Sequence, residues 1–450
     1  MNKVNARKVS VKILCEILEE ECYSNITLNK YLNKIEDTTD RGFITQLVYG
    51  TITNIYYIDY VINSYSKTKT EKMKPLILNC MRISVFQMFF LSKVPVSAIC
   101  NEAVKIVKKS RYSGLASFVN GVLRNIARNK DDIKYPIKEK NVVEYLSIMY
   151  SFPEWIIKLW IDQMESLEVV EDLCKKSNEV SEISLRCNTL KINPEALYEL
   201  LEKSNINCIK GEFVEECIKI SKSSAIKNIK GFDKGYFQVQ DQSSMLVAYA
   251  ANPSEEDLVI DVCAAPGGKS THMAQIMNNK GRIIARDVYE HKLLLIKENY
   301  ERLGINNIET GMYDATKIDE KLIRKADVVL VDAPCSGLGI IRKKPDIKLN
   351  SNENIKELVE IQRQILSVTS NYVKDDGVLI YSTCTINKEE NEQNVKWFTN
   401  NFDFELDSLE QYLPENLSDN LKAGYIQLYP SIHNTDGFFI ARFKRKGLII

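Results

Sequence analysis

The sequence has 450 residues, of which 44% are hydrophobic and 27% are charged, and its 60 basic side chains balance 60 acidic ones. This composition argues against long disorder, and the length exceeds what one hydrophobic core usually organises, so we expect two or three domains. No uncharged apolar run approaches the ~20 residues that cross a bilayer, and the N-terminus has no apolar signal core, which predicts a cytoplasmic protein without a membrane partner.

The cysteines and histidines predict neither disulfides nor a metal site. The 11 cysteines are scattered without a Cys-x-x-Cys pair or a secretion signal, so we expect most of them to be free thiols. The three histidines, His272, His291 and His433, have no partner at metal-ligand spacing. A lone cysteine usually lies in the core, and this is expected for eight of them: Cys15, Cys22, Cys80, Cys100, Cys174, Cys187, Cys208 and Cys217.

The first 140 residues predict a basic, all-helical domain. Apolar side chains recur there at helical spacing in two stretches, Val11, Leu14, Cys15 and Leu18, and then Leu78, Met81, Val85 and Met88. Residues 1–140 contain 23 Lys and Arg against 13 Asp and Glu, a surplus of 10, so the remainder carries a net charge of minus 10. This asymmetry suits a module that faces a polyanion, although a solvated surface would give the same count.

Two changes of pattern divide the rest of the chain. Residues 131–140 mix charges with Pro136 and are typical of a connector, after which residues 141–234 predict linker helices and a small α+β region. Residues 235–450 alternate short β-rich runs with helical patterns, which indicates parallel βαβ units. The predicted domains are therefore a helical domain (1–140), linker helices with an α+β subdomain (141–234), and a Rossmann-like α/β domain with a mostly parallel sheet (235–450).

The strand predicted at residues 258–262 runs into a turn of small residues that opens a helix. The turn consists of Cys263, Ala264, Ala265, Pro266, Gly267, Gly268 and Lys269. Small residues let a ligand approach the backbone, as in phosphate loops and dinucleotide sites. However, a phosphate loop needs glycine where Cys263 stands, and the Gly-x-Gly-x-x-Gly fingerprint is absent. The turn therefore predicts a cofactor site of a different kind.

Acidic residues follow the next two predicted strands. Asp287 lies 20 residues beyond Gly267, where acids of such sheets accept hydrogen bonds from ribose hydroxyls. The alternative is an exposed loop aspartate, and the preceding turn favours the ribose role. Asp314 ends the following unit, and its spacing suggests a contact with an adenine amino group.

Two later strands each lead to a cysteine. The run 328–332 ends at Asp332 and continues to Cys335, and the run 378–381 continues to Cys384. Ligands of open α/β sheets bind at the carboxyl ends of the strands. We therefore expect the cofactor turn, Asp287, Asp332 and both cysteines to share one cleft.

Several of these segments resemble the signature blocks of the RNA cytosine-C5 methyltransferases. The resemblance rests on residues 261–269, 332–337 and 381–384, and residues 184–189, 235–244 and 436–439 extend it to nearly the whole chain. Within that superfamily the chain resembles the branch that modifies bacterial 16S ribosomal RNA. Residues from about Arg7 to Arg128 resemble its NusB-type helical RNA-binding domain, which agrees with the basic surplus.

The resemblance implies S-adenosylmethionine as the methyl donor. Residues 263–269 would bind it together with Asp287, Asp314 and Asp332. The family chemistry needs a thiolate that adds to C6 of cytosine, because C5 is otherwise a poor nucleophile.

By resemblance, Cys384 is that nucleophile and Cys335 assists release of the methylated product. Asp332 is suited to hydrogen-bond the N3 and N4 edge of the base, and Lys269 would lower the pKa of a thiol or position that edge.

The resemblance also implies the substrate, which is cytosine 967 of 16S ribosomal RNA, either as naked RNA or within an assembling subunit, and a monomeric enzyme without a metal. Two alternatives stay open. One is the same chemistry on transfer RNA or 23S ribosomal RNA. The other is an RNA-binding assembly factor that kept the fold and lost catalysis, against which the two cysteines argue.

Overall fold

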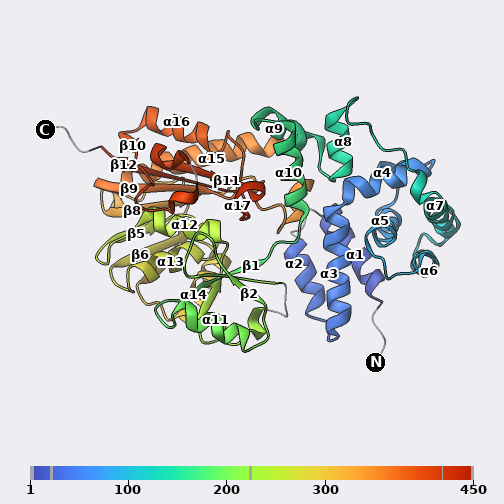
Figure 1. Cartoon of the computed structure of the whole chain (residues 1–450), viewed down its shortest axis with the longest axis horizontal. Helices are drawn as coiled ribbons and strands as arrows, with labels where there is room; N and C mark the ends of the chain where they lie inside the picture. The colour runs from blue at the N-terminus through green and yellow to red at the C-terminus, as the bar shows by residue number, and fades with distance from the viewer. Residues whose placement is uncertain (1–4, 21–23, 222–225, 418, 447–450) are drawn as a thin grey trace. The chain divides into compact units, whose positions relative to one another are not determined.

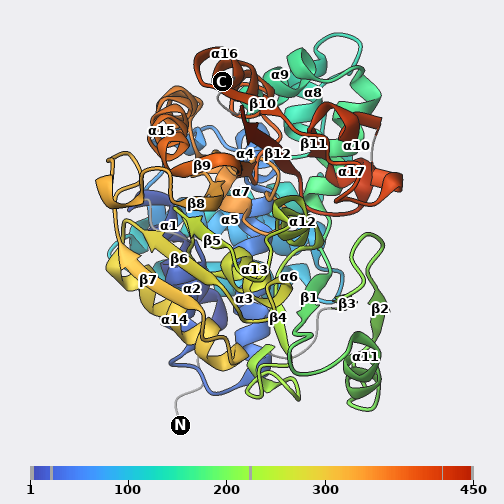
Figure 2. The same cartoon turned by 90° about the vertical axis from the view of Figure 1, so that its left-hand side faces the viewer.

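The computed structural model describes residues 5–20, 24–221, 226–417 and 419–446. The chain divides into two compact units, and their elements are drawn in Figures 1 and 2. One unit comprises Met1–Asn178 with Ile341–Asn350, and the other comprises Glu179–Ile340 with Ser351–Ile450. No helix in the described ranges is long and apolar enough to cross a membrane.

The first unit is all-helical where it is described. Its helices are α1 (Ala6–Glu19), α2 (Ser24–Leu32), α3 (Thr38–Thr53), α4 (Ile55–Tyr65), α5 (Pro75–Phe90), α6 (Val96–Lys108), α7 (Ala116–Arg128), α8 (Val142–Met149), α9 (Glu154–Gln163) and α10 (Leu167–Asn178). Local sequence explains several of the starts: Asp37 accepts hydrogen bonds from the amides of Thr39 and Asp40 at the start of α3, and a proline opens α5.

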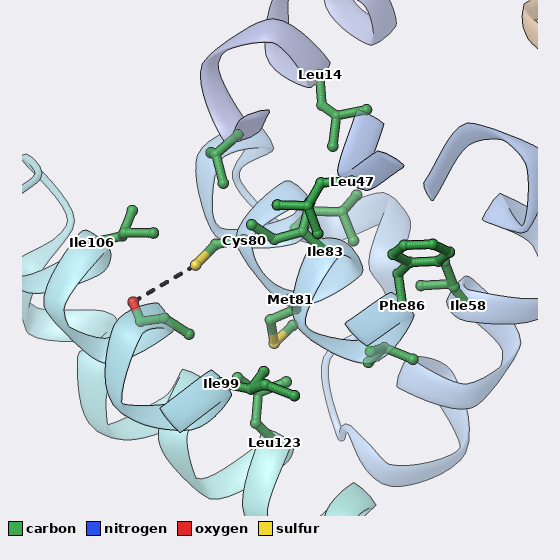
Figure 3. Close-up of a cluster of buried hydrophobic side chains, with 14 of the residues drawn as sticks. Leu14, Leu47, Ile58, Cys80, Met81, Ile83, Phe86, Ile99, Ile106 and Leu123 are labelled. Atoms are coloured by element: carbon green, nitrogen blue, oxygen red, sulfur yellow. Dashed lines mark hydrogen bonds between the residues drawn. The ribbon is translucent and has the colours of Figure 1, made fainter. Parts of the chain in front are cut away.

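Helix α5 forms the centre of this unit. It packs against α1, α3, α4, α6 and α7, and its side chains are buried on nearly every face, as its apolar sequence requires. Figure 3 shows Cys80, Met81, Ile83 and Phe86 of α5 surrounded by Leu14, Leu47, Ile58, Ile99, Ile106 and Leu123 from its neighbours. The Cys80 thiol contacts the carbonyl oxygen of Ala103 at 3.6 Å, the contact dashed in Figure 3.

The segment of residues 341–350 belongs to the helical unit, although it lies more than 160 residues beyond Asn178 in the sequence. In this segment Lys348 is fully buried, and its ammonium donates to the carbonyl oxygens of Thr53 at 3.0 Å and Ser151 at 2.8 Å and to the amide oxygen of Asn178 at 2.7 Å. Burial lowers the pKa of Lys348 to about 7, while its three acceptors favour the charged form.

The second unit begins with a small antiparallel sheet. Its strands are β1 (Ile183–Cys187), β2 (Cys208–Lys210), β3 (Cys217–Ile220) and β4 (Phe237–Val239), in the order β2-β3-β1-β4, with α11 (Pro194–Glu202) between β1 and β2 in sequence. Its apolar side chains form a core of their own with Leu197 and Leu201 of α11.

The larger sheet has eight strands in the order β10-β12-β9-β8-β5-β6-β7, with β11 paired to β12. The strands are β5 (Leu258–Asp261), β6 (Arg282–Asp287), β7 (Ile308–Met312), β8 (Ala326–Asp332), β9 (Val373–Thr383), β10 (Phe404–Leu406), β11 (Tyr425–Leu428) and β12 (Phe438–Arg445). Strands β5 to β9 pair in parallel, whereas β12 runs antiparallel to β9, β10 and β11.

Helices cover both faces of this sheet, which explains why its central strands are apolar on both sides. They are α12 (Gln242–Ala251), α13 (Gly268–Ile276), α14 (Glu290–Leu303), α15 (Glu353–Thr369) and α16 (Glu392–Asn401), and a short α17 (Pro430–His433) precedes β12. Alternate residues of one strand enter different cores: Val328 and Leu330 pack with α12 and α13, while Val329 and Val331 pack with α15 and α16. Figure 2 shows the helices of the two sets around the sheet.

The order of strands places a topological switch between β5 and β8. The chain runs from β5 outward to β6 and β7 and then returns to β8 on the other side of β5. Ligands of open α/β sheets bind at the carboxyl ends of strands beside such a switch. The turn after β5 and the turn after β8 both lie at this position.

The structure confirms the predicted fold class: an all-helical N-terminal part, an α+β region and a mostly parallel sheet. The boundaries at residues 140 and 234 stay predictions.

Of the eight cysteines expected in the core, Cys15 is only half-buried, and Cys22 lies outside the described residues. The other six are buried: Cys80, Cys100, Cys174, Cys187, Cys208 and Cys217.

We predict that Gly50→Ala destabilises the helical unit, because a Cβ atom on Gly50 in α3 would overlap the Phe86 ring of α5. The expected loss is about 1–3 kcal/mol, the usual cost of overpacking a core. Gly42→Ala in the same helix is the control, since nothing lies within 4 Å of its added Cβ, and it should leave stability unchanged or raise it by up to ~1 kcal/mol. Urea unfolding followed by circular dichroism measures both, and equal effects would contradict the packing argument.

We predict a pH-dependent contribution from Lys348. Its folded-state pKa of about 7 lies below the ordinary value of 10.5, so between these pH values the unfolded chain binds more protons and stability rises with pH. The thermal midpoint of wild type relative to Lys348→Met should therefore increase from pH 7 to pH 10. Lys344→Met, which removes an exposed neighbour, should track wild type throughout. A constant gap between wild type and Lys348→Met would refute the assignment.

Candidate active site

Two thiols meet at the carboxyl ends of β8 and β9. These strands pair in parallel with Asp332 opposite Ser382, so the residues that follow them emerge side by side. Cys335 and Cys384 are both partly exposed, and their sulfur atoms lie 3.2 Å apart. The site therefore presents two cysteines that can act on one substrate atom or its neighbour.

Cys335 holds its proton firmly. The hydrogen bond to Cys384, together with burial, raises the pKa of Cys335 well above its ordinary value. The Cys335 S–H can therefore donate to the Cys384 sulfur. A donated hydrogen bond favours the thiolate form of the acceptor.

Backbone contacts fix the loops that carry the thiols. The amide of Ala333 donates to the carbonyl oxygen of Ser382 at 2.9 Å, and the amide of Gly339 donates to that of Cys384 at 3.1 Å. Gly339 has no room for a side chain, because a Cβ atom there would overlap the backbone of Gly437. The loop after β8 is thus held against the loop after β9 on both sides of Cys335.

Asp332 and Lys269 form an ion pair beside the thiols. The Lys269 ammonium lies 2.6 Å from Oδ2 of Asp332 and 5.1 Å from the centre of the Phe438 ring. The Ser382 hydroxyl donates to the other carboxylate oxygen of Asp332 at 2.8 Å. Lys269 is therefore paired with the carboxylate instead of a thiol, which favours its role in positioning over a direct effect on thiol pKa.

The turn after β5 leads directly into the N-terminus of α13. Gly267 has a φ of 94°, a left-handed conformation that favours glycine, and it precedes α13 without capping the helix through a side chain. The first amides of α13 have no acceptors within the helix, so the N-terminus of α13 can bind an anionic group such as a carboxylate. Cys263 lies half-buried at the start of this turn.

A buried acid lies beneath the turn. Asp261, the last residue of β5, accepts a hydrogen bond from the Ser270 hydroxyl at 2.5 Å, and its Oδ1 has no partner among the described residues. Burial raises the pKa of Asp261 to about 7. This carboxyl group thus becomes largely neutral below pH 7.

Asp287 and Asp314 lie where the sequence places them, at the carboxyl ends of β6 and β7. Oδ1 of Asp287 accepts the Tyr289 amide at 3.1 Å and lies 3.6 Å from the Lys292 ammonium, so Oδ2 is the oxygen that a ligand such as a ribose diol would use. Oδ1 of Asp314 is bound by the amide and hydroxyl of Thr316, and these hydrogen bonds lower the pKa of Asp314.

Two exposed apolar side chains accompany these acids and were not identified from the sequence. Val288 is 50% exposed and Met312 is 63% exposed, and both lie at the ends of β6 and β7. Exposed apolar groups beside ribose acceptors suit the faces of an adenine ring. Helix amides for a carboxylate, an acid oxygen for a ribose and apolar faces for a base together fit S-adenosylmethionine.

Arg186 of β1 supports the cofactor turn, and it lies in the block 184–189, to which the sequence analysis assigns no individual role. It is buried and donates to the carbonyl oxygen of Gly268 at 2.6 Å, to the hydroxyl of Thr271 at 3.0 Å and to the side chain of Gln240. Burial lowers the pKa of Arg186 to about 9. The small sheet therefore braces the first turn of α13.

Comparison with known proteins identifies the family. Three family models match: NusB family over residues 4–128, the ferredoxin-like domain of RsmF/B-like methyltransferases over 152–227, and 16S rRNA methyltransferase RsmB/F over 248–444. The probable ribosomal RNA small subunit methyltransferase B of Bacillus subtilis is 38% identical over 99% of this chain and 100% of its own length. The chain belongs to the RsmB/F family of 16S rRNA methyltransferases.

Further relatives agree with this membership. The human 28S rRNA (cytosine(4447)-C(5))-methyltransferase is 32% identical over 72% of this chain and 42% of its own length. Among solved structures, the protein PH0851 has a TM-score of 0.83 and 28% identity, and the match covers 98% of this chain and 99% of that one. The protein is thus a S-adenosylmethionine-dependent RNA methyltransferase, with a NusB-like helical domain, a ferredoxin-like region and a Rossmann-like methyltransferase domain. In the described part of the chain, no three His, Cys, Asp or Glu side chains cluster as metal ligands would.

We predict that Arg186→Met weakens S-adenosylmethionine binding roughly tenfold. The variant loses the Arg186 hydrogen bonds that hold the cofactor turn in its binding position. Isothermal titration calorimetry measures the dissociation constant. Arg282→Met is the control: Arg282 lies on β6 of the same unit but pairs with Glu309 in an exposed ion pair. It should bind the cofactor as wild type does, and an equal loss in both variants would contradict the bracing role.

Proposed function

We propose that this RsmB/F-family enzyme methylates carbon 5 of a cytosine in 16S ribosomal RNA, with Cys384 as the nucleophile and Cys335 as the residue that assists release. The observation that carries the proposal is the 3.2 Å contact between the two sulfur atoms beside the Asp332–Lys269 pair. Cytosine-C5 chemistry needs a nucleophile at C6 and a proton acceptor for C5, and these two carbons are bonded neighbours.

The first step forms the bond between the Cys384 sulfur and C6 of the base. The protonated Cys335 thiol can stabilise the Cys384 thiolate before attack, since a donated hydrogen bond favours the charged acceptor. Addition moves the electron pair of the C5–C6 double bond toward C5 and the N3 side of the ring.

Asp332 and Lys269 assist this addition from the base edge. The Asp332 carboxylate, held by Lys269 through their 2.6 Å ion pair, can accept a hydrogen bond from the N4 amino group, and the Lys269 ammonium can offset the negative charge that develops at N3. The Ser382 hydroxyl fixes the second oxygen of Asp332. The three side chains would together orient the base toward the thiols.

Residues 263–269 would hold the cofactor together with Asp287, Asp314 and Asp332. Bound S-adenosylmethionine supplies an electrophilic methyl group for C5 of the adduct. The turn amides and the Asp287 carboxylate would bind it, and Arg186 fixes the conformation of that turn through its hydrogen bonds to Gly268 and Thr271.

Release requires loss of the C5 proton, return of its electron pair to the C5–C6 bond and departure of the Cys384 thiolate. While Cys384 is a free thiol or thiolate, it raises the pKa of Cys335. In the adduct Cys384 is a thioether, so this effect ends and Cys335 ionises more readily. Cys335 can then accept the C5 proton, which explains why two thiols are needed.

The proposed substrate is 16S ribosomal RNA, with cytosine 967 as the expected target, as naked RNA or in an assembling subunit. The family match and the Bacillus subtilis relative support 16S RNA, and the basic helical domain supports an RNA partner. Transfer RNA and 23S RNA are the competing substrates for the same chemistry. Since the target base must be reached at C6, it would have to be extruded from any helix.

We predict distinct outcomes for the two cysteine variants in an assay with tritiated S-adenosylmethionine and unmodified 16S RNA. Wild type should label cytosine, Cys384→Ala should lose methylation by at least ~10³-fold, and Cys335→Ala should accumulate a covalent protein–RNA adduct on denaturing gels. Cys15→Ser, a half-buried thiol in the helical unit, should behave as wild type. Methylation by Cys384→Ala would refute the nucleophile assignment, and preferential labelling of 23S or transfer RNA would refute the substrate.

A further inference from the structure

A buried carboxylate connects the two cysteine loops without touching either thiol. Glu390 lies in the loop between β9 and α16 and is fully buried. Its backbone is fixed as well. The Tyr381 hydroxyl donates to the Glu390 carbonyl oxygen at 2.7 Å, and the side-chain amide of Asn394 donates to the same oxygen at 3.1 Å. A charged group in such a place needs compensating donors.

Four donors converge on the two carboxylate oxygens. Oε1 accepts the backbone amide of Ser336 at 2.9 Å and the side-chain amide of Gln362 at 3.0 Å. Oε2 accepts the Ser336 hydroxyl at 2.5 Å and the side-chain amide of Asn387 at 3.1 Å. Two of the four bonds therefore go to one residue, Ser336, which is bonded to Cys335.

The direction of the next hydrogen bond follows from counting protons. An ionised carboxylate only accepts, so the single hydroxyl proton of Ser336 points to Glu390. The Ser336 and Thr385 hydroxyl oxygens lie 2.7 Å apart, and Thr385 must be the donor in that contact. The result is a directed chain from Thr385 through Ser336 to Glu390.

This series of hydrogen bonds links the two residues that directly follow the cysteines in sequence. Ser336 follows Cys335, and Thr385 follows Cys384, so one carboxylate restrains both loops. The restraint is direct at Ser336, which has two bonds to Glu390, and indirect at Thr385, which has one bond through the serine hydroxyl. Loss of the carboxylate should therefore displace Cys335 more than Cys384.

We propose that Glu390 is a positioning residue that sets the separation of the two catalytic thiols and, through Ser336, the placement of Cys335 for release of the product. The inference rests on the proposed function for its catalytic consequence, but the geometric part concerns the thiols alone. Because a displacement of about 1 Å at a reacting group costs up to ~10²-fold in rate, a carboxylate remote from the substrate can control one step of the reaction.

Glu390→Gln tests the proposal with little change in shape. The glutamine amide is a donor where Oε2 now accepts, so it cannot accept from Ser336 and Asn387 as the carboxylate does. Glu389→Gln is the matched control, because Glu389 is the adjacent acid and its side chain is exposed. Both variants are first compared with wild type by thermal unfolding.

The first readout needs no RNA. Diamide oxidises neighbouring thiols to a disulfide and is itself reduced, so the rate of Cys335–Cys384 disulfide formation, followed by mass spectrometry, reports how close the two sulfur atoms stay. We expect Glu390→Gln to slow this rate about tenfold, whereas Glu389→Gln keeps the wild-type rate. A wild-type rate in a folded Glu390→Gln protein overturns the proposal, whatever the substrate of the enzyme.

The second readout separates the steps of catalysis. Glu390→Gln should form the covalent RNA adduct but release it slowly, so that adduct accumulates as with Cys335→Ala, while S-adenosylmethionine affinity stays unchanged. Equal slowing of adduct formation and release would overturn the assignment to Cys335.

If Glu390→Gln does not fold, Ser336→Ala takes its place, because it removes the hydroxyl link and keeps the hydrogen bond from the Ser336 backbone amide to Oε1 of Glu390. It should shift both readouts in the same direction, and no shift overturns the proposal.

Discussion

The parallel pairing of β8 with β9 is the constraint on which the rest of the site depends. Because Asp332 stands opposite Ser382, the cysteines three and two residues further on emerge at the same edge and come into contact. A slip of one residue in this register would turn the Asp332 side chain to the other face of the sheet. Strand pairing in the hydrophobic core thus determines the distance between two reactive groups at the surface.

This contact changes the chemistry of the thiol pair. The hydrogen bond to Cys384, together with burial, raises the pKa of Cys335, so Cys335 holds its proton more firmly than an ordinary cysteine does. The supporting groups lie on different elements: Lys269 on α13, Ser382 on β9 and Glu390 before α16. An active site that draws on several elements of one sheet forms only when the whole domain has folded.

Sequence patterns predicted the fold class, two of the N-terminal helices and the residues that follow the central strands of the larger sheet. Helical spacing predicted these two helices, and the turn 263–269 and Cys384 stand out because small or polar residues directly follow apolar runs. Glu390 could not be predicted, because it stands in the acidic run with Glu389 and Glu392, a pattern typical of a solvated surface. Its partner Ser336 lies 54 residues earlier in the chain, and such long-range contacts leave no local signal in the sequence.

The position of Lys348 has a consequence for how the polypeptide can be divided. Residues 341–350 are encoded within the catalytic half, yet they complete the helical unit, where Lys348 satisfies three acceptors. A fragment that ends at residue 178 would lose this lysine and leave those oxygens without their donor. A fragment that begins at residue 179 would carry a lysine and apolar neighbours with no helices to bury them. A cut at residue 178 is therefore expected to give two fragments that are each less stable than the same residues in the intact chain.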